Sequence, residues 1–167
     1  IKGCIELRMA SWFCVAGNYI HNGTLRVGPQ EQDKTQFPMW RDYKCEWGII
    51  QDNRLEDLFF NVRLGTSHVI FRNNVIRMDA RPGPAKPEDG DWAIIIECEK
   101  PGYDEVRKIS DVRIEHNTIL NFSGHGQLIY LSGKPVSLMV RNNVYITGNQ
   151  PGSAGAIFMT SADVEGI

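Results

Sequence analysis

Two arginines in similar surroundings are candidates for binding an anion. Arg26 and Arg63 each lie two residues before a glycine, and apolar residues flank each of them on both sides. Alternate side chains of an extended strand point to opposite faces, so both guanidinium groups should point away from the apolar side. A guanidinium fork could hold a uronate carboxylate or a sulfate. The alternative is a structural ion pair with acidic residues of the following segment, namely Glu31, Asp33 and Asp42.

His125 and Tyr130 are the titratable side chains best placed for proton transfer. His125 lies between two glycines, and Tyr130 follows in the next apolar run. β-Elimination on a uronate polymer needs a cation that neutralises the carboxylate and a base that removes the neighbouring proton. Arg63, His125 and Tyr130 are therefore the candidate catalytic residues. A tight turn, in which the glycines supply positive φ, is the structural alternative for this Gly-His-Gly element.

A long insertion and an acidic loop extend the list of candidates. Residues 28–46 interrupt the apolar pattern, and loops of this length are usually functional or disordered. Trp40 and Tyr43 argue against disorder, so we expect them to bind substrate together with Arg26 and Arg63. Carboxylates around a proline-rich stretch make calcium a possible cofactor, and a solvated acidic loop is the favoured alternative. These are Asp79, Glu88, Asp89 and Asp91.

The cysteines do not define a metal site. Their spacing includes no Cys-x-x-Cys pair, so a zinc site is not expected. An even number allows two disulfides in an exported protein, and isolated small side chains are the alternative. The four residues are Cys4, Cys14, Cys45 and Cys98.

One motif recurs five times and organises the elements that would position these residues. Each copy centres on an asparagine, with apolar residues five and three positions before it and another two positions after it. In the second copy, Gly48 replaces the outermost apolar residue. The alternation has the period of a strand, and the asparagine marks a bend. The five asparagines are Asn18, Asn53, Asn74, Asn117 and Asn143.

A second apolar run follows each asparagine, and no segment keeps a helical apolar face. Two or three short strands per repeat predict a parallel β-helix, a solenoid of about five to six coils with long loop insertions. Equivalent positions would stack about 4.8 Å apart, so the asparagines should form a ladder of amide hydrogen bonds. The outward column two positions before each asparagine should form a charge ladder. Its members are Ala16, Gln51, Arg72, Glu115 and Arg141.

Three copies of the motif resemble a known family. Val-Ile-Phe-Arg-Asn-Asn-Val-Ile, Val-Arg-Ile-Glu-His-Asn-Thr-Ile and Leu-Met-Val-Arg-Asn-Asn-Val-Tyr resemble coils of bacterial right-handed parallel β-helix repeat proteins, the pectate-lyase-like superfamily. The resemblance covers about residues 5–160 and implies an all-β, right-handed parallel β-helix. This superfamily includes lyases, hydrolases, epimerases, tailspikes and adhesion proteins, so the fold alone does not select a function.

The Gly-His-Gly element around His125 resembles one motif of the polygalacturonase-type glycoside hydrolases. The paired aspartates and the Arg-Ile-Lys motif of those enzymes do not occur in this sequence. Without a carboxylate pair there is no general acid and base to cleave a glycosidic bond by water. Hydrolysis is therefore not expected.

Composition limits the partners. The formal net charge of −2 implies no bulk attraction to nucleic acid or to an anionic membrane. The sequence contains no stretch of about 18 apolar residues that would span a bilayer. Residues 1–167 should form a single domain, and the start at Ile1 suggests a mature fragment of a longer chain. A solenoid exposes strand edges at its ends, so we expect capping coils or a partner chain there.

Two functions remain open at this point. The first is a secreted or cell-surface protein that binds or processes polysaccharide, and its enzyme form would be a lyase acting on an acidic polysaccharide. The second is a non-catalytic surface, adhesion or extracellular assembly protein whose partners are other chains. Convergent titratable groups in a groove would favour the enzyme. End-to-end stacking would favour assembly.

Overall fold

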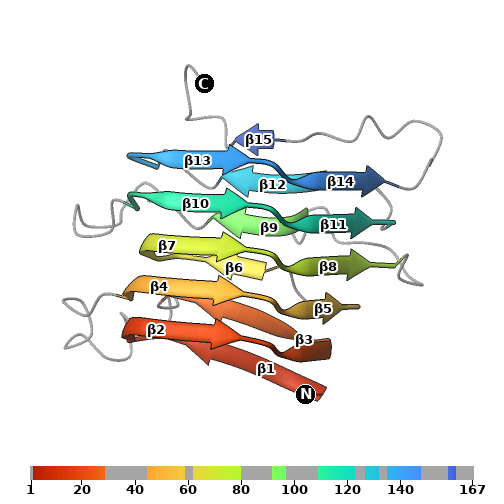
Figure 1. The fold of residues 1–167 in the computed structure, drawn as a ribbon, viewed down its shortest axis with the longest axis horizontal. Helices are drawn as coiled ribbons and strands as arrows, with labels where there is room; N and C mark the ends of the chain where they lie inside the picture. The colour runs from red at the N-terminus through yellow and green to blue at the C-terminus, as the bar shows by residue number, and fades with distance from the viewer. Residues whose placement is uncertain are drawn as a thin grey trace.

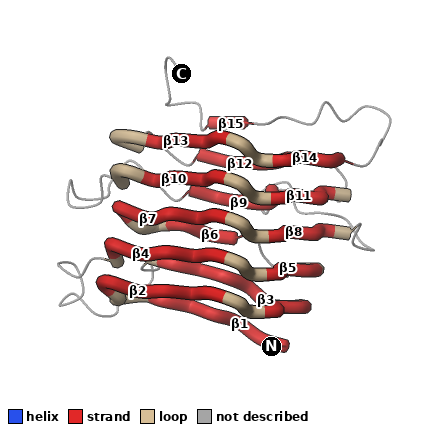
Figure 2. Tube along the Cα trace, in the orientation of Figure 1, coloured by secondary structure: helices blue, strands red, loops and turns tan. Residues whose placement is uncertain are grey.

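The protein folds into strands alone over the part of the chain that can be described. The computed structural model describes residues 2–28, 45–58, 62–79, 92–96, 109–122, 127–131, 135–147 and 158–160. Figure 2 shows only strands, turns and loops in these ranges. The predicted all-β class is confirmed. No helix that could cross a membrane occurs within the same ranges.

Five strands form the smaller sheet, and every neighbouring pair in it is parallel. Its order is β13-β10-β7-β4-β2. Each of these strands ends just before one of the five motif asparagines, and they lie one above another in Figure 1. The strands are β2 (Ser11–Ala16), β4 (Glu46–Gln51), β7 (Ser67–Arg72), β10 (Val112–Glu115) and β13 (Leu138–Arg141).

Ten strands form the larger sheet, which is also parallel and has two halves joined by the long strand β3 (Tyr19–Val27). The first part of β3 pairs with β5, and its last part pairs with β6 and β1. One half continues from β5 (Arg54–Glu56) to β8 (Val75–Met78), β11 (Thr118–Asn121) and β14 (Val144–Thr147). The other half contains β1 (Lys2–Leu7), β6 (Val62–Leu64), β9 (Trp92–Ile96), β12 (Gln127–Leu131) and β15 (Phe158–Thr160).

In the first repeat β3 serves both halves of the larger sheet, and each later repeat contributes one strand to each of three stacks. The repeat β7, β8, β9 runs through the smaller sheet, then one half of the larger sheet, then its other half (Figure 1). Successive repeats pair in the register that the asparagine motif predicts, because Val69 aligns with Gly48 on one side and with Val112 on the other. The parallel strand arrangement expected from the sequence is therefore present.

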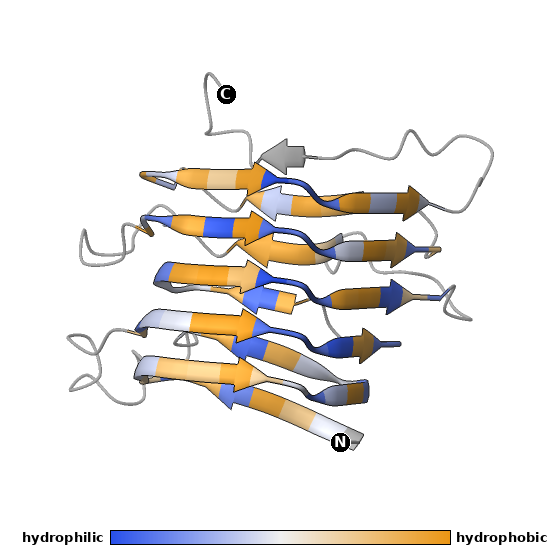
Figure 3. Ribbon diagram, viewed as in Figure 1, coloured by the Kyte–Doolittle hydropathy of each residue, from blue (hydrophilic) through white to orange (hydrophobic). Residues whose placement is uncertain are grey.

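The core lies between the sheets and consists of stacked apolar columns. Ile20, Leu55, Ile76 and Ile119 align across four strands, and none of them is exposed to solvent. Figure 3 shows the apolar residues of each strand at matching positions from repeat to repeat. These columns are what the two-residue alternation in the sequence encodes, since inward side chains recur at every second position.

One column explains the glycine in the second repeat. Gly48 occupies the position of an inward apolar residue, and a side chain placed there would collide with the ring of Phe13 in the preceding strand. The Phe13 ring therefore fills the space that Gly48 leaves. The two residues conserve the volume of the column, which is the condition for dense packing.

The bend between the smaller and the larger sheet uses a left-handed residue. In every repeat the residue just before the ladder asparagine has φ between 52° and 67°. Glycine, asparagine, aspartate and histidine adopt this conformation more readily than other residues, and only these types occur here. The residues are Gly17, Asp52, Asn73, His116 and Asn142.

Candidate binding face on the five-stranded sheet

The asparagines form a continuous ladder inside the bend. Asn53 donates from its backbone N to Asn74 Oδ1 at 3.0 Å and from its Nδ2 to the same oxygen at 2.9 Å. Its Nδ2 also donates to the backbone oxygen of Val15 at 2.9 Å. The same pattern links Asn74 with Asn117 and Asn117 with Asn143. The structure thus brings all five ladder residues together, and their amides fix the chain where it turns.

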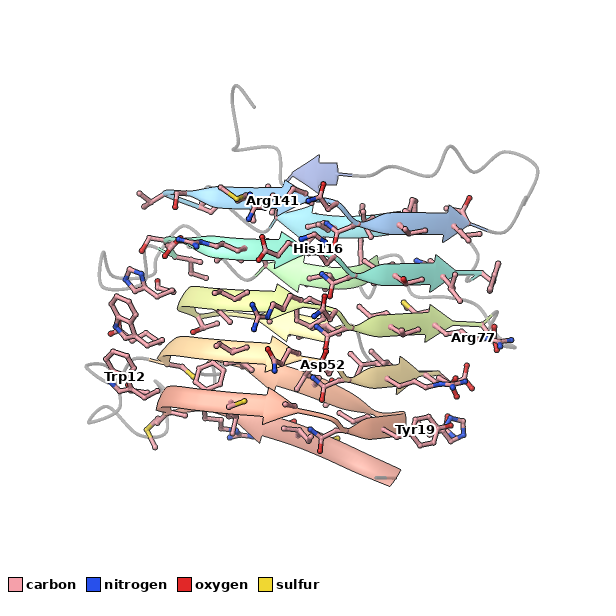
Figure 4. All side chains as sticks on the ribbon, in the orientation of Figure 1. Trp12, Tyr19, Asp52, Arg77, His116 and Arg141 are labelled. Atoms are coloured by element: carbon pink, nitrogen blue, oxygen red, sulfur yellow. The ribbon has the colours of Figure 1, made fainter. Side chains whose placement is uncertain are left out.

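The outer face of the five-stranded sheet is the candidate functional site, and we call it the binding face. It carries three columns that run across the strands. Figure 4 labels one member of each of two columns, Trp12 near the start of β2 and Arg141 near the end of β13. The aromatic column lies at the start of the strands and contains Trp12, Trp47, His68 and Asp111. The middle column contains Cys14, Ile49, Ile70, Arg113 and Met139. The charged column contains Ala16, Gln51, Arg72, Glu115 and Arg141.

The aromatic column is a stack of nearly parallel rings. The ring centroids of Trp12 and Trp47 are 5.4 Å apart, with an interplanar angle of 12°. Those of Trp47 and His68 are 4.0 Å apart at 9°. His68 Nδ1 then lies 3.5 Å from Asp111 Oδ2. Trp12 is 79% exposed and Trp47 is 44% exposed, so two indoles of one face are open to solvent.

The backbone of the aromatic column is unusual. All four residues have φ between 51° and 62°, although large side chains rarely adopt this region. Left-handed non-glycine residues cost free energy and tend to occur where function retains them. Sequence analysis missed this column. Its signal was available, because each member lies six positions before the ladder asparagine of its own repeat.

Asp111 is the acidic residue of the aromatic column, and its carboxylate interacts with Arg113 and His68. Arg113 Nε donates to Asp111 Oδ1 at 3.0 Å. This hydrogen bond lowers the pKa of Asp111 below its ordinary value, and the interaction with His68 lowers the pKa further. Asp111 is therefore an ionised acceptor at neutral pH, next to the imidazole that stacks on Trp47.

The charged column forms the ladder that the sequence predicts. Arg72 donates from Nε and Nη2 to Gln51 Oε1 at 3.0 and 2.8 Å. Arg141 Nε donates to Glu115 Oε2 at 2.8 Å, and this bond lowers the pKa of Glu115. A carboxyl group with a lowered pKa cannot act as a general acid at neutral pH. The column can therefore bind polar groups, and Glu115 does not supply a general acid at neutral pH.

The two arginines of the expected anion site lie on the larger sheet, away from the binding face. Arg26 and Arg63 are aligned partners in β3 and β6, as the sequence predicts. The residue aligned with Arg26 on its other side is Glu6 of β1, which also pairs with Arg8 at 3.0 Å. An acidic residue thus lies beside the arginine pair. The acidic residues of the insertion, Glu31, Asp33 and Asp42, lie outside the described residues.

Only two of the three expected catalytic residues can be located. Tyr130 aligns with Ile95, and Ile95 aligns with Arg63, so all three share one outward column. Two strand spacings separate Arg63 from Tyr130, which is roughly 10 Å. The Tyr130 ring contacts Trp92, with centroids 5.3 Å apart. His125 lies outside the described residues, as do Trp40 and Tyr43 of the expected substrate site.

The expected calcium ligands are mostly outside the described ranges as well. Glu88, Asp89 and Asp91 cannot be placed, and Asp79 accepts a hydrogen bond from Arg77 Nε at 3.1 Å. Within the described ranges no group of three or more histidine, cysteine, aspartate or glutamate side chains could hold a metal ion. Three cysteines are free thiols, and Cys98 lies outside these ranges. The free thiols are Cys4, Cys14 and Cys45.

A second polar cluster lies on the outer surface of the larger sheet. Tyr19 Oη donates to Glu56 Oε2 at 2.7 Å, and Arg54 Nε donates to Glu56 Oε1 at 2.7 Å. The hydrogen bond from Tyr19, followed by that from Arg54, lowers the pKa of Glu56. Tyr19 is 49% exposed, so it is a further exposed aromatic residue, on a different face. Its cluster provides a matched control for the binding face.

Comparison with known proteins does not assign this arrangement to a family. No protein-family model matches the sequence, and no curated protein or solved structure matches it significantly.

Proposed function

We propose that the chain is a right-handed parallel β-helix of the pectate-lyase-like type and that its binding face binds polysaccharide. Three features support the fold proposal: uniformly parallel pairing, three stacks of strands, and an asparagine at every bend. A polysaccharide ligand implies a secreted or cell-surface location, which forms part of the same proposal.

The exposed indole of Trp12, which stacks on Trp47, carries the functional proposal. Large apolar side chains gathered on one exposed face mark interaction sites more often than chance exposure does. The C–H face of a pyranose ring is apolar and packs against the electron-rich face of an indole. Trp12 offers such a face, because among the described residues Trp47 stacks on one side of its ring and the side chain stays largely exposed.

The neighbouring columns supply the hydrogen bonds that a sugar requires. Arg72, Arg113 and Arg141 each bond one residue of the face, and their guanidinium groups carry five N–H donors each. Carboxylate and amide oxygens beside them accept bonds from hydroxyl groups. A glycan that runs across the strands meets an equivalent position at every strand, about 4.8 Å apart.

Charge balance favours a neutral polysaccharide over a strongly acidic one. Two of the three arginines of the binding face pair with a carboxylate, namely Arg113 with Asp111 and Arg141 with Glu115. Opposite charges at contact distance cancel much of the long-range field that would attract a polyanion. The ligand class that fits best is therefore a neutral, extended glycan.

A lyase is the second candidate, and it concerns the other face. The shared outward column of Arg63 and Tyr130 favours it, since β-elimination needs a cation and a base on one surface. Incubation with polygalacturonate, with and without calcium, tests it through the ultraviolet absorbance of the unsaturated product. Release of that product, and its loss in the Arg63→Gln variant, would establish the enzyme.

Affinity electrophoresis tests the binding proposal. Wild-type protein should be retarded in gels that contain hydroxyethylcellulose, and Trp12→Ala should weaken binding about tenfold, because one stacking contact is lost. Tyr19→Ala is the control, since it removes a comparably exposed ring from the larger sheet. Equal retardation of Trp12→Ala and wild type would refute the proposal. So would equal losses in both variants.

A further inference from the structure

One half of the larger sheet has an outer face that polysaccharide binding does not use. The strands β5, β8, β11 and β14 form it, and they lie one above another in Figure 1. Each strand contributes two outward residues, one on either side of the buried column of Leu55, Ile76 and Ile119. We call this surface the second face. Its first column is Arg54, Val75, Thr118 and Val144, and its second column is Glu56, Arg77, Leu120 and Ile146.

The second face is apolar over β11 and β14. Val144 is 55% exposed and Ile146 is 47% exposed, and Val75 of β8, at 37%, extends the same surface. Large apolar side chains that lie together on one exposed face mark an interaction surface. The outer face of a sheet is well suited to another sheet, which packs about 10 Å away with its side chains interdigitated.

The second face carries one charge of each sign on β5. Arg54 Nε donates to Glu56 Oε1 at 2.7 Å, and the Arg54 side chain nevertheless stays 65% exposed. The other oxygen of Glu56 accepts a hydrogen bond from Tyr19 Oη at 2.7 Å. A guanidinium has five N–H donors and a carboxylate accepts about four hydrogen bonds, so both groups can bind a further partner.

A two-fold axis that runs along the stack makes two copies of the second face complementary. This axis sets every strand against the same strand of the other copy, so that a residue of the first column faces the second-column residue of that strand. The facing pairs are Val144 with Ile146, Thr118 with Leu120, Val75 with Arg77, and Arg54 with Glu56. Apolar side chains thus meet on β11 and β14, and opposite charges meet on β5. Arg77 can cover Val75 with its aliphatic stem, while its Nε keeps the hydrogen bond to Asp79.

A two-fold axis that runs along the strands does not give this match. An axis over β5 sets Arg54 against Arg54 and Glu56 against Glu56, and like charges that face each other repel. An axis between β8 and β11 sets the charges of β5 against Val144 and Ile146, where they lose water without gaining a partner. Charge complementarity therefore selects the axis along the stack.

We propose that two copies of this chain pack together through their second faces, about a two-fold axis parallel to the stack. This inference goes beyond polysaccharide binding and does not depend on it, because it uses a different sheet. Every strand meets its own counterpart, so the match does not depend on how many repeats precede or follow these four strands. Two outward residues on each of four strands give eight per copy, whereas an interface of standard size uses about 20–30 residues on each side. The dimer should therefore be weak.

Sedimentation equilibrium at protein concentrations from about 10 μM to 1 mM tests the proposal, since a small interface needs high concentration. The weight-average mass of the wild type should rise from that of one chain toward that of two and no further, because a two-fold contact is closed. Ile146→Lys sets a charge against Val144 of the other copy, twice in each dimer, and should sediment as a monomer. Met139→Lys is the matched control, because it adds the same charge on the smaller sheet at a similar exposure, 45% against 47%.

Three outcomes of this measurement would overturn the proposal: a wild-type monomer at all concentrations, species larger than a dimer, or an equal effect of Ile146→Lys and Met139→Lys. Circular dichroism confirms the fold of each variant. Val144→Lys, which changes the facing residue of the same strand, replaces Ile146→Lys if that variant unfolds.

Charge exchange on β5 tests the axis itself. Arg54→Glu and Glu56→Arg each set like charges against one another at two symmetric positions, so each variant alone should sediment as a monomer. A 1:1 mixture of the two should form a heterodimer, because every contact between positions 54 and 56 then joins opposite charges. The double variant Arg54→Glu, Glu56→Arg should recover self-association for the same reason. A mixture and a double variant that both stay monomeric would overturn the proposal.

Discussion

Replacing Asn74 by alanine should destabilise the protein far more than the same truncation at the end of the ladder. Asn74 is 1% exposed and lies in the middle of the file. Its Oδ1 accepts two hydrogen bonds from Asn53, at 3.0 and 2.9 Å. Its Nδ2 donates to the backbone oxygen of Ile50 at 3.0 Å and to Asn117 Oδ1 at 3.1 Å. Asn74→Ala removes all four of these side-chain bonds and keeps the two backbone ones, from Asn74 N to Asn117 Oδ1 and from Thr118 N to the Asn74 backbone oxygen.

The loss can be worked out from these contacts. A buried hydrogen bond contributes about 1 kcal/mol net, so four bonds correspond to a loss of about 4 kcal/mol in the free energy of unfolding. Part of this loss comes from the Asn53 N–H, which stays buried without its acceptor. For a chain of this length, 1 kcal/mol shifts the melting temperature by about 2–4 °C. Asn74→Ala should therefore melt about 8–16 °C below the wild type.

Asn18→Ala is the matched control, because Asn18 ends the ladder. Its Nδ2 makes two hydrogen bonds, to Asn53 Oδ1 at 3.0 Å and to the Ala16 backbone oxygen at 3.1 Å. Water can replace bonds at this half-buried position, so we expect a loss of about 1 kcal/mol or less. Urea titrations followed by circular dichroism measure both variants. Equal losses for Asn18→Ala and Asn74→Ala would refute the reasoning that ladder bonds stabilise the bend through burial.

Three further predictions follow from packing and charge. Gly48→Ala should cost about 1–3 kcal/mol through overpacking against Phe13, and the double variant with Phe13→Ala should recover part of that loss in urea titrations. Burial raises the pKa of the Cys45 thiol, so alkylation with iodoacetamide should reach it only after unfolding, well after the two exposed thiols. The Arg141 bond lowers the pKa of Glu115 from its ordinary 4.5, so it stabilises the fold above that pH and is lost as pH falls. Urea midpoints of the wild type and Arg141→Gln should thus differ most near neutral pH and converge in acid; a constant difference would contradict this assignment.

The repeat could be predicted because two sequence signals mark the same positions: the alternation of apolar residues marks the strand, and the asparagine marks the bend. An asparagine such as Asn74 is a poor strand former, and its recurrence after an alternating run has few explanations other than a stacked bend. The same register orders the charged column, so Glu115 and Arg141 could be paired from sequence spacing alone. Alternation with a period of two is a local signal, and here the residues that it marks as inward form the core columns of the tertiary structure.

The aromatic column could not be read from local pattern. Trp12 and Trp47 are separated by a long insertion, so their contact depends on a register that spans 35 positions. The left-handed backbone conformation of Trp12 and Trp47 also could not be predicted, since tryptophan rarely adopts it. The sequence instead predicts substrate binding by two aromatic residues of the insertion, Trp40 and Tyr43. That prediction concerns residues outside the described ranges.

The neighbour of the arginine pair shows a second limit of sequence reasoning. Glu6 aligns with Arg26 because β1 pairs with the last part of β3. β1 precedes the first asparagine motif, so no repeat register assigns its position. The sequence predicts an acidic neighbour in the insertion that follows Arg26, whereas the structure places Glu6 of the preceding strand there.

The most direct test of polysaccharide binding is a titration followed by the indole N–H signals in a ¹H–¹⁵N NMR spectrum. Addition of a neutral glycan, such as a soluble cellulose oligomer, should shift the signals of Trp12 and Trp47 and leave that of buried Trp92 unchanged. Saturable shifts at the first two residues are the predicted result. A spectrum in which neither moves, or in which Trp92 beside Tyr130 moves instead, would contradict the assignment of the binding face.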